Sequence, residues 1–189
     1  MKILLVCSTG GHFKTLQQLR PFWEKHDRIW VTFHTTPTDI ALQGENVYWA
    51  YSPTNRNIPN LMRNFWLAWK VVANERPHLV LSTGAGVAVP FLILAKLWGG
   101  ATAFVESITR VEELSLSARL VLPFLDIIYV HWLQLKTKYP KAELIASIPD
   151  QTPLGEMTEK KDNSGRNHHL PLAFQFDKDN RCDFSNSWN

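Results

Sequence analysis

The sequence is poor in cysteine and has no long hydrophobic run. Its 189 residues include only two cysteines, Cys7 and Cys182, which stand far apart and lack metal-site spacing. This excludes a disulfide framework and a cysteine-type zinc site, and it indicates a reducing, cytoplasmic setting. The longest apolar stretch, residues 87–98, contains Pro90 and Lys96 and is shorter than the roughly 20 residues of a spanning helix. We therefore expect any membrane contact to be peripheral or made through a partner.

The sequence also lacks a large excess of charge of either sign. The chain has 20 Lys and Arg against 17 Asp and Glu, a formal net charge of +3. A nucleic-acid-binding surface normally shows a dense basic stripe, so no nucleic-acid partner is expected. No acidic cluster has metal-ligand spacing, and the adjacent His168 and His169 in a polar segment are more often incidental than ligands. We expect neither a metal nor another cofactor.

Short apolar runs alternate with longer helical patterns along most of the chain. This alternation is typical of an α/β fold with a Rossmann-like parallel sheet and helices on both of its faces. The runs are apolar at successive positions, as in strands buried on both sides. Strands are expected at residues 3–7, 28–33, 46–50, 78–82, 101–106 and 127–131. Helices are expected at residues 13–25, 59–74, 87–98 and 113–124.

Composition changes near residue 149, beyond which Asp, Glu, Lys, Asn, Ser, Gly and Pro dominate around one apolar island at 170–176. A chain of this length can bury one substantial core. We therefore expect one domain at residues 1–147 and a polar, flexible C-terminal tail at residues 148–189.

The helix expected at residues 59–74 is amphipathic. Helical spacing places four apolar residues on one face, Leu61, Phe65, Ala68 and Val72. Aromatic and basic side chains on this helix would suit the boundary between water and lipid headgroups, and a core-facing helix with a solvated basic side explains the same pattern. The candidate membrane-surface residues are Arg63, Trp66, Trp69 and Lys70.

A glycine loop follows the first expected strand and consists of Ser8, Thr9, Gly10, Gly11 and His12. In an open parallel sheet, ligands bind outside the carboxyl ends of the strands. The glycines would let a ligand approach the backbone, and the amides at the start of the next helix would attract phosphate. His12 is a candidate catalytic residue that could accept a proton from a sugar hydroxyl. The alternative is a tight turn in which His12 only caps the helix.

A second loop of small residues follows the strand expected at residues 78–82, and it consists of Ser82, Thr83, Gly84, Ala85 and Gly86. Two such loops at neighbouring strand ends would converge on one crevice, with the glycine amides of both loops facing it. Each loop taken alone is equally consistent with a tight turn.

A third segment contains Glu106 and Arg110, four positions apart after another expected strand. Glu106 could bind sugar hydroxyls or act as a base, and Arg110 could hold a phosphate. The alternative is an ion pair between the two that orders the loop. Neither glycine loop reads G-x-G-x-x-G and no Gly-Lys-Ser/Thr is present, which disfavours a nicotinamide site and a P-loop.

Four segments in order carry a resemblance to a known family, at residues 8–12, 82–90, 104–120 and 129–142. The chain resembles, over about residues 1–146, the acceptor-side subunit of the eukaryotic enzyme that adds the second GlcNAc to dolichyl diphosphate GlcNAc. It is similar also to the bacterial capsule and exopolysaccharide homologues of that subunit. The resemblance implies a fold equivalent to the N-terminal half of a GT-B glycosyltransferase. It also implies a separate, small catalytic subunit that binds the UDP-sugar.

The resemblance assigns roles to the segments. The residues implied to bind the acceptor and its diphosphate are Ser8, Thr9, Gly10, Gly11, Gly84, Ala85, Gly86 and Arg110. His12 and Glu106 are the candidate catalytic residues. The acceptor would be a polyprenyl-diphosphate-linked sugar at the cytoplasmic face of the membrane, and the chain would be inactive alone. The eukaryotic relatives carry an N-terminal anchor that this sequence does not show, so a bacterial origin is expected.

Thr15 and His131 depart from residues common in the family, which bears on substrate identity. Two other functions fit the same loops. One is a non-catalytic module that recruits or stabilises the catalytic subunit at the membrane. The other is an independent small α/β enzyme for another phosphorylated ligand.

Overall fold

The computed structural model describes residues 1–54, 57–145, 175–176 and 182–183. Contacts within the chain define two units, Met1–Leu144 and Ile145–Asn189. In the second unit the structure describes one antiparallel pair, β8 (Gln175–Phe176) and β9 (Cys182–Asp183). The expected flexibility of the tail, and His168 and His169 within it, lie outside the described residues. A domain boundary at residue 147 stays a prediction.

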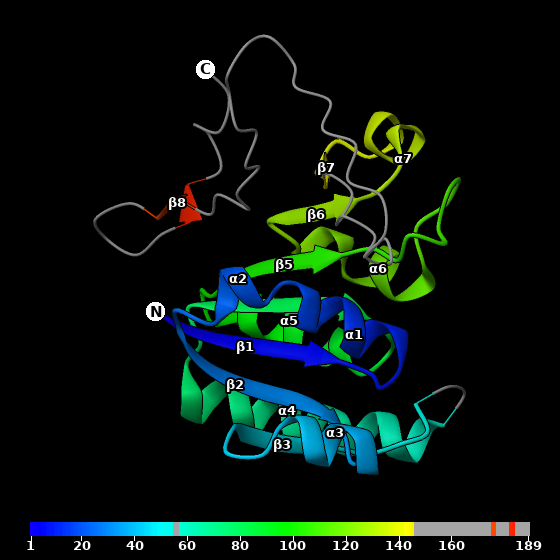
Figure 1. Cartoon of the computed structure of the whole chain (residues 1–189). Coiled ribbons are helices and arrows are strands. Elements are labelled where there is room, and N and C mark those ends of the chain that lie inside the picture. The colour runs from blue at the N-terminus through cyan, green and yellow to red at the C-terminus, as the bar shows by residue number, and fades with distance from the viewer. Residues whose placement is uncertain (55–56, 146–174, 177–181, 184–189) are drawn as a thin grey trace, which may run out of the picture. The chain divides into compact units, whose positions relative to one another are not determined.

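The first unit contains a seven-stranded parallel sheet in the order β3-β2-β1-β4-β5-β6-β7. The strands are β1 (Lys2–Cys7), β2 (Asp27–Phe33), β3 (Asn46–Ala50), β4 (Leu79–Gly84), β5 (Ala101–Val105), β6 (Ile127–Val130) and β7 (Ala142–Leu144). Their carboxyl ends point to one edge of the sheet (Figure 1). The strand order reverses between β1 and β4, which makes their ends the topological switch point where open α/β sheets bind ligands.

Helices pack on both faces of the sheet, as the sequence predicts. Leu4 and Val6 of β1 belong to the core cluster shared with α4 (Ile58–Glu75) and α5 (Ala88–Leu97). On the opposite face, Phe13 of α1 (Gly11–Gln18) packs against Trp30 of β2. The burial pattern of β1 and β4 is continuous, as expected for central strands. β3 is only partly buried because it forms the edge of the sheet.

Several helix predictions are corrected by the structure. The single helix expected at residues 13–25 is two helices, α1 and α2 (Arg20–Trp23), with Pro21 in the first turn of α2. The helix expected from residue 113 begins only after Ser115, whose side chain caps α6 (Leu116–Val121), and η1 (Leu122–Phe124) follows. Sequence patterns missed three short elements, α3 (Thr36–Ala41), α7 (Leu133–Lys138) and β7.

The apolar face expected on α4 is buried only in part, which corrects the alternative in which the whole face packs on the core. Ala68 is buried, but Leu61 and Phe65 are 45% and 42% exposed. The helix instead buries Asn60 and Asn64 beside Ala68. The reason is tertiary: the Asn64 side chain accepts from Tyr51 N and donates to Tyr51 O, both at 2.9 Å, and Asn60 Nδ2 donates to the carbonyl of Pro53. These amides satisfy backbone groups after β3, so polar residues take the inner face.

Glu75 connects three elements. Its carboxylate accepts hydrogen bonds from Tyr48 of β3 at 2.7 Å and from Lys2 of β1 at 3.1 Å. These bonds, the one from Tyr48 above all, hold the pKa of Glu75 below its ordinary value. A carboxyl group with a lowered folded-state pKa stabilises the fold above its unfolded-state pKa, and this stabilisation is lost as pH falls through the folded-state pKa.

We predict that Glu75→Gln lowers the free energy of unfolding by about 1–2 kcal/mol near neutral pH, because the charged acceptor is lost. The difference from wild type should shrink in acid, and urea titrations across pH measure it. Glu24→Gln, which removes an exposed pair with Arg20, serves as the control and should cost less than about 0.5 kcal/mol. A loss at Glu75 that does not change with pH would contradict the prediction.

Candidate functional site at the glycine loops

The first glycine loop opens α1 at the carboxyl end of β1. Gly10 stands at the N-cap with φ of 76°, no side chain caps the helix, and its first turn has no acidic residue. A Cβ added at Gly10 or Gly11 would meet no atom within 4 Å, so the space in front of both residues is open. The first-turn N–H groups have no partners within the helix, and the helix dipole adds partial positive charge there. The loop therefore has the donors and the room to bind an anion.

His12 connects the two glycine loops. Its Nδ1 lies 2.6 Å from the carbonyl oxygen of Thr83, and Thr83 Oγ1 donates back to the His12 carbonyl at 2.7 Å. A carbonyl can only accept, so Nδ1 carries the proton in this contact. In the neutral ring Nε2 then has a lone pair, and it has no hydrogen-bond partner among the described residues. His12 is thus held in the tautomer that can accept a proton at Nε2.

Gly84 provides the space for the His12 ring. A Cβ at Gly84 would lie 2.8 Å from His12 Cε1 and 3.0 Å from Nδ1. Gly84 also has φ of 122°, and the next residue, Ala85, adopts φ of 76° although it is not glycine. The Gly84 amide donates to Ser82 Oγ at 3.0 Å. That amide is therefore used within the loop, and the expectation that it faces a ligand is corrected.

The two loops meet at the switch point. Gly86 has room, since a Cβ there would make only ordinary contact with Thr54 at 3.7 Å. The α5 helix, which begins just beyond it, likewise has no side-chain cap. The ligand-binding roles of the remaining loop residues stay predictions, and these residues are Ser8, Thr9, Gly10, Gly11, Ala85 and Gly86.

Glu106 follows β5 and is 2% exposed. Its Oε1 accepts from Ser107 N at 2.8 Å and its Oε2 from Ser115 N at 2.7 Å, so the carboxylate closes the loop between them. The expected alternative of an ion pair with Arg110 is wrong, because the described residues contain no such pair. Both oxygens are engaged in ordering the loop, and this geometry favours a structural role for Glu106 over the role of a base.

Two further residues lie near Glu106. Burial lowers the pKa of His131, and the carbonyl and charge of Glu106 oppose this shift only in part. Arg110 is exposed in the loop that Glu106 orders. Among the described residues, Arg110 makes no hydrogen bond or ion pair to either glycine loop, so its phosphate-binding role stays a prediction.

An apolar stripe runs along the outside of α4. Its members, each between 42% and 72% exposed, are Ile58, Leu61, Met62, Phe65, Trp66 and Trp69. The rings of Trp69 and Trp98 pack edge to face with their centroids 4.6 Å apart, and this contact extends the stripe to the end of α5. The basic residues Arg63 and Lys70 are exposed on the same helix. No helix in the described part of the chain is long and apolar enough to cross a bilayer. The sequence showed these apolar residues, but helical spacing alone left open whether Leu61 and Phe65 face the core or the surface.

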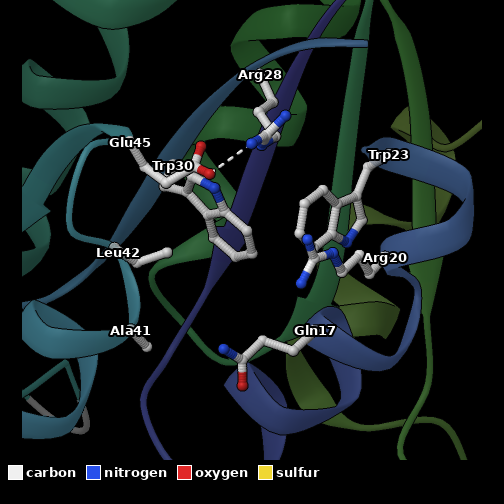
Figure 2. Close-up of a pocket in the computed structure, with 8 residues that line it drawn as sticks. All are labelled: Gln17, Arg20, Trp23, Arg28, Trp30, Ala41, Leu42 and Glu45. Carbon is white, nitrogen blue, oxygen red and sulfur yellow. Dashed lines mark hydrogen bonds and ion pairs between the residues drawn. The ribbon is translucent and has the colours of Figure 1, made fainter. Parts of the chain in front are cut away.

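A cavity of about 270 Å³ lies elsewhere, between α1, α2 and β2. Figure 2 shows Trp23 and Trp30 beside each other in it, with Arg28 and Glu45 paired at one end. Trp23 is 6% and Trp30 1% exposed, so their ring faces are closed to a ligand. Arg28 lies near the amino end of β2, at the opposite end from the glycine loops. We therefore do not assign the site to this cavity.

Comparison with known families now bears on the same segments. The profile of a family described as "Oligosaccharide biosynthesis protein Alg14 like" matches residues 51–148, more than half of the 189 residues. This chain belongs to the Alg14 family. The Alg14 match includes the second glycine loop, α4 and the loop ordered by Glu106, whereas Gly10, Gly11 and His12 lie before it.

Curated Alg14 relatives agree. The human UDP-N-acetylglucosamine transferase subunit ALG14 is 36% identical over 93 residues, which cover 46% of this chain and 43% of the human protein. The subunit of that name from Yarrowia lipolytica is 37% identical over 86 residues, 42% of this chain and 40% of its own length. The chain thus spans about two fifths of the length of the curated relatives it matches.

Solved structures confirm the GT-B fold of this Alg14-family chain. MurG from Acinetobacter baumannii matches with a TM-score of 0.57 and 14% identity over 71% of this chain and 43% of its own. A UDP-GlcNAc 2-epimerase from Methanocaldococcus jannaschii matches with a TM-score of 0.61 and 15% identity over 77% of this chain and 45% of its own. The predicted fold, a Rossmann-like sheet equivalent to one half of a GT-B protein, is therefore confirmed.

We predict that Gly84→Ala displaces the His12 ring, because the added methyl would lie 2.8 Å from Cε1. NMR signals of the His12 ring should shift in the folded variant. Gly99→Ala is the matched control, since Gly99 also has positive φ, at 84°, and an added Cβ there meets nothing within 4 Å. Both variants should lose roughly 1 kcal/mol from backbone strain. Unchanged His12 signals in Gly84→Ala would contradict the contact.

Proposed function

We propose that this chain is the acceptor-side subunit of a two-subunit glycosyltransferase. In this proposal it binds a polyprenyl-diphosphate-linked sugar at the cytoplasmic face of a membrane, and a separate subunit binds the UDP-sugar. The observation that carries the proposal is the meeting of His12 with Thr83 and Gly84, since it places a proton acceptor beside an open helix N-terminus at the switch point. The names of the curated relatives, as transferase subunits, support it.

The acceptor's diphosphate would bind at the start of α1. Its charge suits the free amides and dipole of that turn, and Gly10 and Gly11 leave room for it. A sugar attached to the diphosphate would extend from there toward His12. The Nε2 lone pair would accept the proton of the acceptor hydroxyl as the hydroxyl oxygen attacks the donor sugar and the bond to UDP breaks. The partner subunit would stabilise the departing UDP.

The proposed partner follows from what this chain covers. Its fold accounts for 43% of the MurG chain and 45% of the epimerase chain, so each of those proteins has another half beyond the match. A second subunit that supplies the corresponding half would close the site over the glycine loops, and the chain would be inactive alone. The resemblance to bacterial homologues extends the proposal to capsule or exopolysaccharide assembly in a bacterium.

Reconstitution tests the catalytic part of the proposal. The purified chain should show no transfer from UDP-GlcNAc to a polyprenyl-diphosphate-linked GlcNAc until a candidate donor-binding subunit is added. In the active mixture His12→Gln should lower kcat by ~10²-fold, because Gln accepts protons poorly. His26→Gln, a histidine remote from the loops, should leave kcat unchanged.

Two results would oppose this part of the proposal. Full activity of the chain alone would remove the need for a partner. An unchanged kcat in His12→Gln, with altered subunit assembly, would favour the non-catalytic recruiting module instead.

The outer stripe of α4 is proposed as the membrane contact. Large apolar side chains in the stripe would enter the headgroup region, and Arg63 and Lys70 beside them would attract anionic lipid. Trp66, at 71% exposed, and Met62, at 58%, are among the most exposed side chains of the stripe, together with Ile58 at 72%. Such a contact would hold the acceptor site near the surface where a lipid-linked sugar resides.

Vesicle flotation tests this contact. Met62→Ser with Trp66→Ser should weaken binding to vesicles that contain anionic lipid by about 10²-fold, because each of the two lost insertions removes ~1.5 kcal/mol. Leu116→Ser with Leu120→Ser on α6 is the control, since these side chains are 66% and 55% exposed on another helix. Equal loss in both double variants, or none in either, would oppose a role for α4.

A further inference from the structure

The end of β4 contains an irregularity that the proposed mechanism has not used. Val6 of β1 pairs with Ser82, and the next residue, Cys7, pairs with Gly84. Thr83 is therefore an extra residue on β4 with no partner on β1. Such a bulge frees backbone groups from the ladder and re-aims a side chain, and bulges are frequent beside functional sites.

Two polar groups of Thr83, its backbone carbonyl and its side-chain hydroxyl, bond to His12. The Thr83 hydroxyl donates to the His12 carbonyl at 2.7 Å, and the Thr83 carbonyl accepts from His12 Nδ1 at 2.6 Å. The two bonds run in opposite directions between the same two residues, 71 positions apart in the chain. One bond fixes the backbone at the start of α1, and the other fixes the orientation of the ring.

Thr83 is also well placed to hold this arrangement rigidly. It is 1% exposed, so its hydroxyl is shielded from competing water. Ser82 holds the Gly84 amide, and Gly84 leaves the volume that the imidazole fills. The Thr83 carbonyl and the missing Cβ of Gly84 thus act on the His12 ring, and the Thr83 hydroxyl acts on the His12 backbone.

We infer that Thr83 is a positioning residue, which acts from a β-bulge to hold His12 in the Nδ1–H tautomer and so leaves the Nε2 lone pair available. This inference concerns the same site as the proposed function and rests on it for its catalytic meaning. The geometry of the ring can nevertheless be measured without any activity. The second loop is accordingly a support for His12 as well as a candidate acceptor-binding segment.

The test compares Thr83→Val with Thr83→Ser. Valine keeps the branched shape and removes the hydroxyl, whereas serine keeps the hydroxyl. Nitrogen NMR of the free chain reports which ring nitrogen of His12 carries the proton. We expect the Nδ1–H tautomer in wild type and in Thr83→Ser. In Thr83→Val the carbonyl that accepts from Nδ1 remains, but the His12 backbone is no longer held by the hydroxyl, so this bond should loosen and a mixture of both tautomers should appear.

Thr102→Val is the matched control. Thr102 is a buried threonine on the neighbouring strand β5, and its hydroxyl also donates to a carbonyl, that of Phe124, at 2.7 Å. Thr102 Oγ1 also accepts from Asp126 N at 3.1 Å, so its loss should lower stability at least as much and leave the His12 ring signals unchanged. This comparison separates a specific effect on His12 from general loosening of the fold.

In the reconstituted enzyme, Thr83→Val should lower kcat by roughly 10-fold with little change in KM for the acceptor, and Thr83→Ser should restore it. An unaltered His12 tautomer in Thr83→Val would overturn the inference. A shifted tautomer together with an unaffected kcat in His12→Gln would overturn the proposed function and leave the positioning of His12 by Thr83 intact.

Discussion

The parallel pairing of β1 with β4 at the centre of the sheet is the constraint on which the rest of the structure depends. It brings the segment after β1 next to the end of β4. His12 and Thr83, 71 residues apart in the chain, thereby come within hydrogen-bonding distance. The strand order reverses there, and open α/β sheets bind ligands at such a switch point. The open helix N-terminus, the fixed imidazole and the space left by Gly84 are all consequences of this one pairing.

The helix α4 shows how a site can shape a surface far from it. Asn60 and Asn64 turn inward because backbone groups of the segment after β3 need partners, and Thr54 in that segment lies beside Gly86. Once the asparagines occupy the inner face, the large apolar side chains between them face solvent. The exposed stripe is thus linked through α4 to the same segment that borders the second glycine loop.

The family match and the fold show that this chain corresponds to only one part of the GT-B proteins it resembles. The chain belongs to the Alg14 family, and its fold matches less than half of each GT-B neighbour. A carboxyl edge with free amides and a proton acceptor suits an anionic, hydroxyl-bearing acceptor. The part of each GT-B neighbour that lies beyond the match is the reason for proposing a second subunit.

The sequence by itself determined the sheet, its six main strands and the loops at their ends, because buried parallel strands are continuous apolar runs and glycines mark the turns. It also singled out His12. Only the tertiary structure decided that Gly84 serves the His12 ring, that Glu106 binds Ser107 and Ser115 in place of Arg110, and that Leu61 and Phe65 face outward. Each of these outcomes depends on a hydrogen-bond partner or a close contact remote in sequence or set by loop geometry, and helical or strand periodicity carries no information about such partners.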